Sequence, residues 1–130
     1  MTEKDEQAAV IKWCRNLAPL RYSTYCSEIQ GAVILPYVTA RNETSRRGKW
    51  RSSQGNIKGI PDLFFPLVAP QQEGGEWAGL WIELKVEGGT VSPEQDQWLD
   101  ILNRAGYYAD VCYSALDAIE LIELYLGGEL

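Results

Sequence analysis

Two short segments of the sequence carry charged side chains at spacings that suit phosphodiester hydrolysis. Glu83 and Lys85 stand two residues apart in the alternating stretch 80–86, and strand residues two apart face the same side, roughly 7 Å from each other. If the strand that carries Asp62 pairs with this one, a second carboxylate joins them, and the backbone carbonyl of Leu84 adds another oxygen. We therefore expect an oxygen-rich site for Mg²⁺ or Mn²⁺, in which Lys85 orients water or stabilises phosphate charge.

The composition excludes several other hydrolase classes. The chain has 130 residues and no histidine, so it lacks a Ser-His or Cys-His couple and the imidazole ligands of most catalytic zinc sites. Its three cysteines lie far apart without CxxC spacing, which predicts reduced core residues rather than disulfides or a zinc site. Carboxylates, lysines and a hard metal ion remain for hydrolytic chemistry.

The cationic residues are distributed unevenly. The net charge is -6, yet six of the twelve Lys and Arg lie between residues 41 and 58. This segment is polar and without periodicity, which is typical of an exposed loop, and we expect it to bind phosphates. The alternative is a solvated loop that only keeps the protein soluble. The candidate nucleic-acid contacts are Arg46, Arg47, Lys49, Arg51 and Lys58.

The elements that must position these residues follow from local patterns. Thr2 and Asp5 predict a helix start, and apolar spacing predicts a helix over 3–17. We expect strands over 32–39, where Pro36 favours an edge position or a bend, and over 62–65, then a turn over 69–79 and the strand 80–86. Ser92 and Gln95 form a capping box for the next helix, which precedes a strand over 107–113. Ser114 caps a last helix over 115–126.

This order predicts an α/β fold with a mixed central β-sheet flanked by helices. The last strand follows its predecessor through a helix, so the two strands should be parallel. No repeat or linker divides the chain, and we expect one domain over 1–130. No segment approaches the roughly 18 apolar residues that a bilayer requires, and the acidic start MTEKDEQ fits neither a secretory signal nor a transit peptide.

The two chemical segments together resemble the pattern of a known superfamily. Gly59-Ile60-Pro61-Asp62 followed by Ile82-Glu83-Leu84-Lys85 looks like the PD-(D/E)XK nuclease pattern, which implies a restriction-endonuclease-like core. With SPEQDQW after the glycine pair at 88–89, the set resembles the VRR-NUC family, the virus-type replication-repair nuclease domain, and its small stand-alone members in phages and bacteria. The resemblance runs from about residue 34 to 126.

The resemblance also implies roles for individual residues. Asp62 and Glu83 would bind the metal, Lys85 would be catalytic and Gln95 would support them. An acid in the first helix is usual in the family, and Glu6 is the first choice for it, with Glu3 in reserve. Asn42 matches an asparagine that the family often carries in the loop before GxPD.

The resemblance further implies a DNA substrate, branched or junction-containing, and a homodimer that acts like a Holliday-junction resolvase in replication, recombination or repair. We expect it to act in the cytoplasm, in the bacterial host cell if phage-encoded. No P-loop pattern surrounds the glycine pair, so no nucleotide cofactor is expected. The alternatives are a non-catalytic DNA-binding or subunit module that retains the fold, and a sequence-specific restriction-type endonuclease.

Each candidate site residue also has a purely structural interpretation. Glu83 and Lys85 would then form an exposed ion pair worth about 0–1 kcal/mol, and Asp62 would cap a turn at the entry of its strand. Gln95 is fully explained by its place in the capping box, although this role is compatible with a second one in the site.

Overall fold

The computed structural model describes residues 2–16, 36–39 and 58–130. The expectations for residues 17 and 32–35, for Cys26, and for Asn42, Arg46, Arg47, Lys49 and Arg51 lie outside these ranges.

The described residues form a mixed α/β structure. One sheet has the strand order β1-β2-β5-β6. Neighbours β1 with β2 and β2 with β5 are antiparallel, whereas β5 and β6 are parallel and connected through α3. This topology confirms the predicted mixed sheet, and among the described strands β1, which follows Pro36, lies at the edge. The elements are α1 (Glu3–Arg15), β1 (Tyr37–Val38), β2 (Leu63–Phe65), β3 (Ala69–Pro70), β4 (Glu76–Trp77), β5 (Leu80–Leu84), α3 (Pro93–Arg104), β6 (Tyr108–Cys112) and α4 (Ala115–Leu126).

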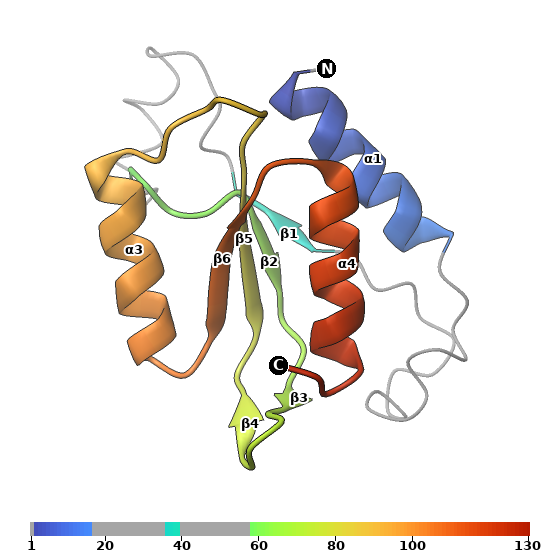
Figure 1. Cartoon of the computed structure of the whole chain (residues 1–130), viewed down its shortest axis with the longest axis vertical. Helices are drawn as coiled ribbons and strands as arrows, with labels where there is room; N and C mark the ends of the chain where they lie inside the picture. Colours follow the sequence, from blue (N-terminus) through green and yellow to red (C-terminus); the bar gives the residue numbers. More distant parts are fainter. Residues whose placement is uncertain (1, 17–35, 40–57) are drawn as a thin grey trace.

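The helices lie on both faces of this sheet. Figure 1 shows α1 and α4 side by side on one face and α3 on the other. Alternate residues of β5, namely Leu80, Ile82 and Leu84, are buried in a core shared with Val10 of α1 and Ile122 of α4. Three parts of the fold lie at the same end of the sheet, the upper end in Figure 1. They are the start of α1, the start of α3 and the carboxyl end of β5.

Each helix begins where the sequence predicts a cap. Thr2 and Asp5 form a reciprocal capping box at α1, and Ser92 and Gln95 form another at α3. The Ser114 side chain accepts a hydrogen bond from the N–H of Asp117 at the start of α4. These caps fix where each helix enters the fold, and therefore where the residues of its first turn point.

Several predicted boundaries differ from the structure. Residues 69–79, expected to be a turn, contain the short antiparallel hairpin β3–β4, which closes through Gly74 and Gly75 at positive φ. The strand expected over 80–86 ends at Leu84. Helix α1 ends at Arg15, and the Asn16 side chain caps its last turn by donating to the carbonyl of Lys12 at 2.9 Å.

Two further expectations concern cysteines and membranes. Cys14 and Cys112 are buried free thiols, as predicted for core residues. Among the helices of the described ranges, none has the length and apolar character to cross a membrane.

Candidate active site

Strand β5 divides its side chains between the core and the opposite face of the sheet. Ile82 is buried in the hydrophobic core, whereas Glu83 points to the other face and is 0% exposed. Lys85 follows directly after the strand, and its Nζ lies 3.5 Å from Glu83 Oε2. The prediction that Glu83 and Lys85 share one wall is therefore confirmed, and their burial separates them from an ordinary surface ion pair.

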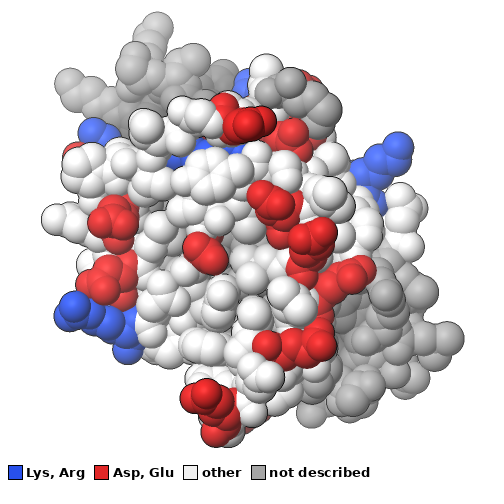
Figure 2. Space-filling view, viewed as in Figure 1, with Lys and Arg blue, Asp and Glu red and all other residues white. Residues whose placement is uncertain are grey.

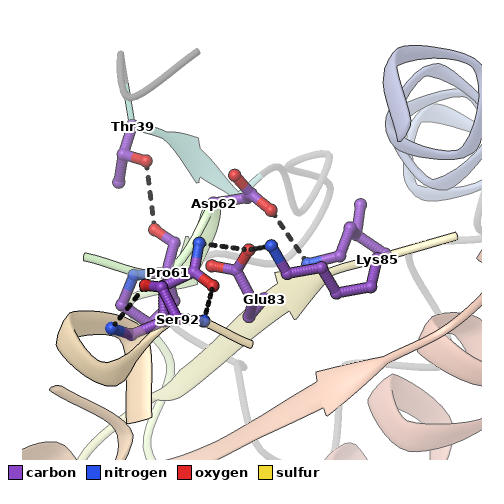
Figure 3. Close-up of polar contacts among 8 residues, drawn as sticks. Thr39, Pro61, Asp62, Glu83, Lys85 and Ser92 are labelled. Carbon is purple, nitrogen blue, oxygen red and sulfur yellow. Dashed lines mark hydrogen bonds and ion pairs between the residues drawn. The ribbon is translucent and has the colours of Figure 1, made fainter. Parts of the chain in front are cut away.

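Asp62 reaches the same place from the neighbouring strand. It stands directly before β2, and its Oδ2 accepts a hydrogen bond from the backbone N–H of Leu84 at 2.8 Å. Thr39, at the end of β1, holds the backbone here: its N–H donates to the Asp62 carbonyl at 2.9 Å and its Oγ1 to the Pro61 carbonyl at 3.0 Å. Figure 3 shows the contact between Thr39 and Pro61 and the hydrogen bond that the Asp62 carboxylate accepts. No local pattern points to Thr39, because its partners are more than twenty residues away.

Gly59 brings the segment before Asp62 against the start of α3. Its φ is +94°, and an added Cβ would lie 2.8 Å from the backbone carbon of Glu94. Only glycine combines this backbone conformation with such a close approach. The glycine of the GxPD motif thus sets the distance between the Asp62 segment and the helix that carries Gln95.

Gln95 belongs both to a helix cap and to the site. Its Oε1 accepts a hydrogen bond from the N–H of Ser92 at 2.9 Å, and its Nε2 donates to Glu83 Oε2 at 3.4 Å. The cap orients the amide so that its donor end points at the carboxylate (Figure 3). The structural and the functional interpretation of Gln95 are therefore compatible.

The third carboxylate of the cluster comes from Glu3. Carboxylate oxygens of Glu3, Asp62 and Glu83 all lie within 4.8 Å of one another. The sequence favours Glu6 for this position with Glu3 in reserve, but the structure places Glu3 in the cluster, and Glu6 Oε2 instead accepts a hydrogen bond from the N–H of Ala115, at the start of α4. The exposed N–H groups at a helix start attract a carboxylate, which explains where Glu6 points.

The Leu84 carbonyl faces strand β2 at a position where the opposite residue is a proline. The Lys85 N–H donates to the Cys112 carbonyl of β6 at 2.9 Å, so the backbone of the preceding residue, Leu84, faces β2. The β2–β5 register, continued by two residues, places Pro61 opposite Leu84. Proline has no N–H to donate to that carbonyl. The predicted role of the Leu84 carbonyl as a further oxygen ligand is compatible with this geometry.

This donor set suits a hard divalent cation. Three carboxylates from α1, the β2 entry and β5 converge, and Asp62 and Glu83 are 2% and 0% exposed. Carboxylates this close repel by about 3 kcal/mol per pair at an effective dielectric constant of about 20, and Lys85 supplies one positive charge against three negative ones. Oxygen ligands of this kind are those that Mg²⁺ and Mn²⁺ take in proteins.

One member of the predicted phosphate-binding loop lies within the described residues. Lys58 is exposed, and its Nζ lies 3.6 Å from Glu94 Oε1 at the start of α3. It directly precedes Gly59, on the segment that leads to Asp62. Lys58 is therefore close in the chain to the carboxylate cluster, and its predicted contact with DNA stays a prediction.

Two comparisons with known proteins both match the VRR-NUC domain. The model of the VRR-NUC domain matches residues 2–116 of the chain. A solved structure of a VRR_NUC domain protein superposes with a TM-score of 0.72 at 21% sequence identity, over 98% of this chain and 89% of the other. At this identity the superposition shows the fold alone. No curated protein matches the sequence.

Proposed function

Because this chain belongs to the VRR-NUC domain family, a nuclease-type family, we propose that it is a deoxyribonuclease that depends on Mg²⁺ or Mn²⁺. The observation that carries the proposal is the convergence of the carboxylates of Glu3, Asp62 and Glu83 within 4.8 Å, with the Lys85 ammonium at 3.5 Å from Glu83. This combination can hold a metal ion and a phosphate side by side.

The residues divide the chemistry between them. Glu3, Asp62 and Glu83 would hold the metal, together with the Leu84 carbonyl. When bound, Mg²⁺ would polarise the scissile phosphate and lower the pKa of a nearby water. Lys85 would orient the attacking water or stabilise the charge that develops on the phosphate.

Two contacts keep the carboxylates in place before the substrate arrives. The Leu84 N–H fixes Asp62 at 2.8 Å, and the Gln95 amide donates to Glu83 at 3.4 Å. Both act on residues that would touch the metal, and such supporting contacts typically change metal affinity or activity by about 10- to 100-fold. Gln95 is therefore a positioning residue in this mechanism.

For the substrate we propose branched DNA, cut endonucleolytically by a homodimer in replication, recombination or repair of a phage or bacterium. The short basic segment between residues 41 and 58 supports the dimer, because one copy could neutralise only a few phosphates and two copies would double that number. A dimer would also present two carboxylate clusters to two of the strands of a four-way junction. Sedimentation equilibrium that finds only monomers at micromolar concentration, with and without junction DNA, would contradict this part.

The first test is cleavage of labelled four-way junction, flap, single-stranded and duplex DNA with Mg²⁺, Mn²⁺ or EDTA. The variant Asp62→Asn keeps an oxygen that can accept from the Leu84 N–H but removes the charge that binds metal. We expect metal-dependent cutting to fall by about 100-fold or more, as for the loss of a metal-site contact at the upper end of its range.

The matched control is Asp100→Asn, which makes the same chemical change at an exposed carboxylate that pairs with Arg104 at 3.1 Å on α3. It should cut like wild type, since an exposed pair contributes little. Metal-free DNA binding without cutting of any substrate would favour the non-catalytic module. Cutting of a single duplex sequence would favour the restriction-type enzyme.

A further inference from the structure

The cations of the described residues fall into two groups. Three of them form ion pairs: Lys85 with Glu83, Arg104 with Asp100, and Lys58 with Glu94. Lys4, Lys12 and Arg15 are exposed, and no ion pair within the described ranges involves them. All three belong to α1. We call them the α1 cationic face.

These three residues form one surface because of helical geometry. At about 100° per residue, positions 4, 12 and 15 lie within one quarter of the helix circumference, and a rise of about 1.5 Å per residue separates Lys4 from Arg15 by about 16 Å along the axis. A shallow groove follows this side, and its lining includes Lys4, Ala8, Ile11, Lys12 and Arg15. The separation of about 16 Å between Lys4 and Arg15 corresponds to about five nucleotide steps of one DNA strand, at about 3.4 Å per step.

The acids of α1 are engaged at its first turn. Glu3 joins the carboxylate cluster, Glu6 binds the N–H of Ala115, and Asp5 closes the capping box with Thr2. Among the described residues that line the groove, all three cations of the α1 cationic face are present and none is an acid. Figure 2 shows acidic side chains across the visible face of the molecule and cations at its margin, including the flank where α1 lies in Figure 1.

The Lys4 end of the α1 cationic face lies close to the proposed active site. Glu3 stands in the cluster, and Lys4 is the next residue of the same helix. Buried Val10 and Cys14 pack the inner side of α1 into the core, so the distance between the face and the cluster is fixed by a rigid element. Glu3 lies about 100° around the helix from Lys4, so a DNA strand that lies along these cations would reach the carboxylates by passing around the first turn of α1.

On the basis of the proposed function, we propose that the α1 cationic face binds the sugar-phosphate backbone of the DNA next to the bond that is cut. Lys4, Lys12 and Arg15 contact phosphates and carry no sequence information, because such contacts set register and orientation only. The surface adds affinity to an acidic protein, and it aligns the substrate strand with Glu3 and its neighbours in the cluster.

The chain offers a closely matched pair of variants for the test. Arg15 is the last residue of α1, and Arg104 is the last residue of α3. Both are exposed, and Arg15→Gln and Arg104→Gln change net charge equally. Binding of labelled junction DNA is followed by fluorescence anisotropy in Ca²⁺, between about 50 and 200 mM salt, and cleavage of the same DNA is measured in Mg²⁺.

If the α1 cationic face binds DNA, Arg15→Gln lowers the slope of log K against log salt by about one, and Lys12→Gln/Arg15→Gln lowers it by about two. KM for DNA rises several-fold for each lost contact, while kcat at saturating DNA stays at the wild-type value. Arg104→Gln keeps the wild-type slope and KM. Thermal unfolding of both single variants should match wild type, since exposed substitutions change stability little.

The failures of the two proposals are distinguishable. Unchanged slope and KM in Lys12→Gln/Arg15→Gln, in a protein that cuts DNA, overturns the α1 proposal and leaves the nuclease intact. An equal effect of Arg15→Gln and Arg104→Gln also overturns it, because net charge and not location would then decide. Wild type that binds DNA without cutting it overturns the proposed function, and the slope still decides the role of α1. Wild type that binds no DNA overturns both.

Discussion

Glu6 Oε2 accepts a hydrogen bond from the backbone N–H of Ala115 at 2.6 Å, and so ties the first turn of α1 to the first turn of α4. Glu3, one turn earlier, supplies a carboxylate to the cluster with Asp62 and Glu83. Because α1 starts at a capped end and is held one turn later by this contact, the contact fixes the direction in which Glu3 points. We therefore expect Glu6 to act as a positioning residue for the proposed metal site.

Replacing Glu6 with alanine should raise the Mg²⁺ concentration that gives half-maximal cleavage by about 10-fold or more, as for other supporting contacts of metal ligands. Glu6→Gln keeps an oxygen acceptor for the Ala115 N–H and should restore most of the wild-type value. In a Glu3→Gln background, Glu6→Ala should add little, because residues that act through one another are not additive. A full additional loss in that background would show that Glu6 does not act through Glu3.

Gly59→Ala tests the packing of the Asp62 segment on α3. The new Cβ would lie 2.8 Å from the Glu94 backbone in a residue with φ of +94°, so we expect a loss of stability of about 3 kcal/mol or more. Gly74→Ala is the control, because its φ is +106° and its Cβ would meet no atom within 4 Å. It should lose only about 1 kcal/mol of stability, the cost of placing alanine at a positive φ. Urea unfolding measures both, and equal losses would contradict the packing argument.

Local features of this fold were predictable from the sequence, because they depend on neighbours in the chain. The capping boxes at Thr2 and Ser92 follow from residues three positions apart, and the shared wall of Glu83 and Lys85 follows from strand periodicity. The pairing of β2 with β5, which brings Asp62 close to the end of β5, is a conditional expectation that the register confirms.

The long-range choices were not predictable from local patterns. Glu3 and Glu6 stand one turn apart on the same helix, and what separates them is the position of the α4 start, more than one hundred residues away. Thr39 supports the Asp62 backbone across a gap of more than twenty residues. The β3–β4 hairpin was missed because each of its strands is only two residues long, too short for an alternating pattern.

The two described thiols should be unreactive in the folded protein. Burial raises the pKa of Cys14 to about 11, and burial together with Asp110 and Asp117 raises the pKa of Cys112 to about 12, from 9.0 in each case. In a Cys26→Ser background at about pH 8, we expect DTNB to label neither thiol until urea unfolds the chain, since the thiolate is the nucleophile. Rapid labelling without urea would contradict the burial of both residues.

The same shifts set the sign of a pH effect on stability. The unfolded chain releases these thiol protons near pH 9, at a lower pH than the folded chain does. Below pH 9 the full contribution of both thiols to the free energy of unfolding is therefore present. It is lost as the pH rises from there toward about 11 for Cys14 and about 12 for Cys112. Cys14→Ala/Cys112→Ala should show a smaller fall in the free energy of unfolding between about pH 9 and 10 than the parent protein. An equal fall would assign the effect to other groups.

Lys85→Met separates catalysis from metal binding. Methionine keeps most of the apolar stem but removes the ammonium that lies 3.5 Å from Glu83 Oε2. If Lys85 acts on the water or the phosphate, kcat should fall by about 100-fold or more, as when one donor to a developing charge is removed. Mn²⁺ affinity, measured by calorimetry, should stay the same or increase, because the cation that competes for Glu83 is gone. Asp62→Asn should instead lower both kcat and Mn²⁺ affinity. A folded Lys85→Met protein with full kcat would remove Lys85 from the mechanism, and parallel losses of kcat and Mn²⁺ affinity would reassign it to holding Glu83 in the metal-binding position.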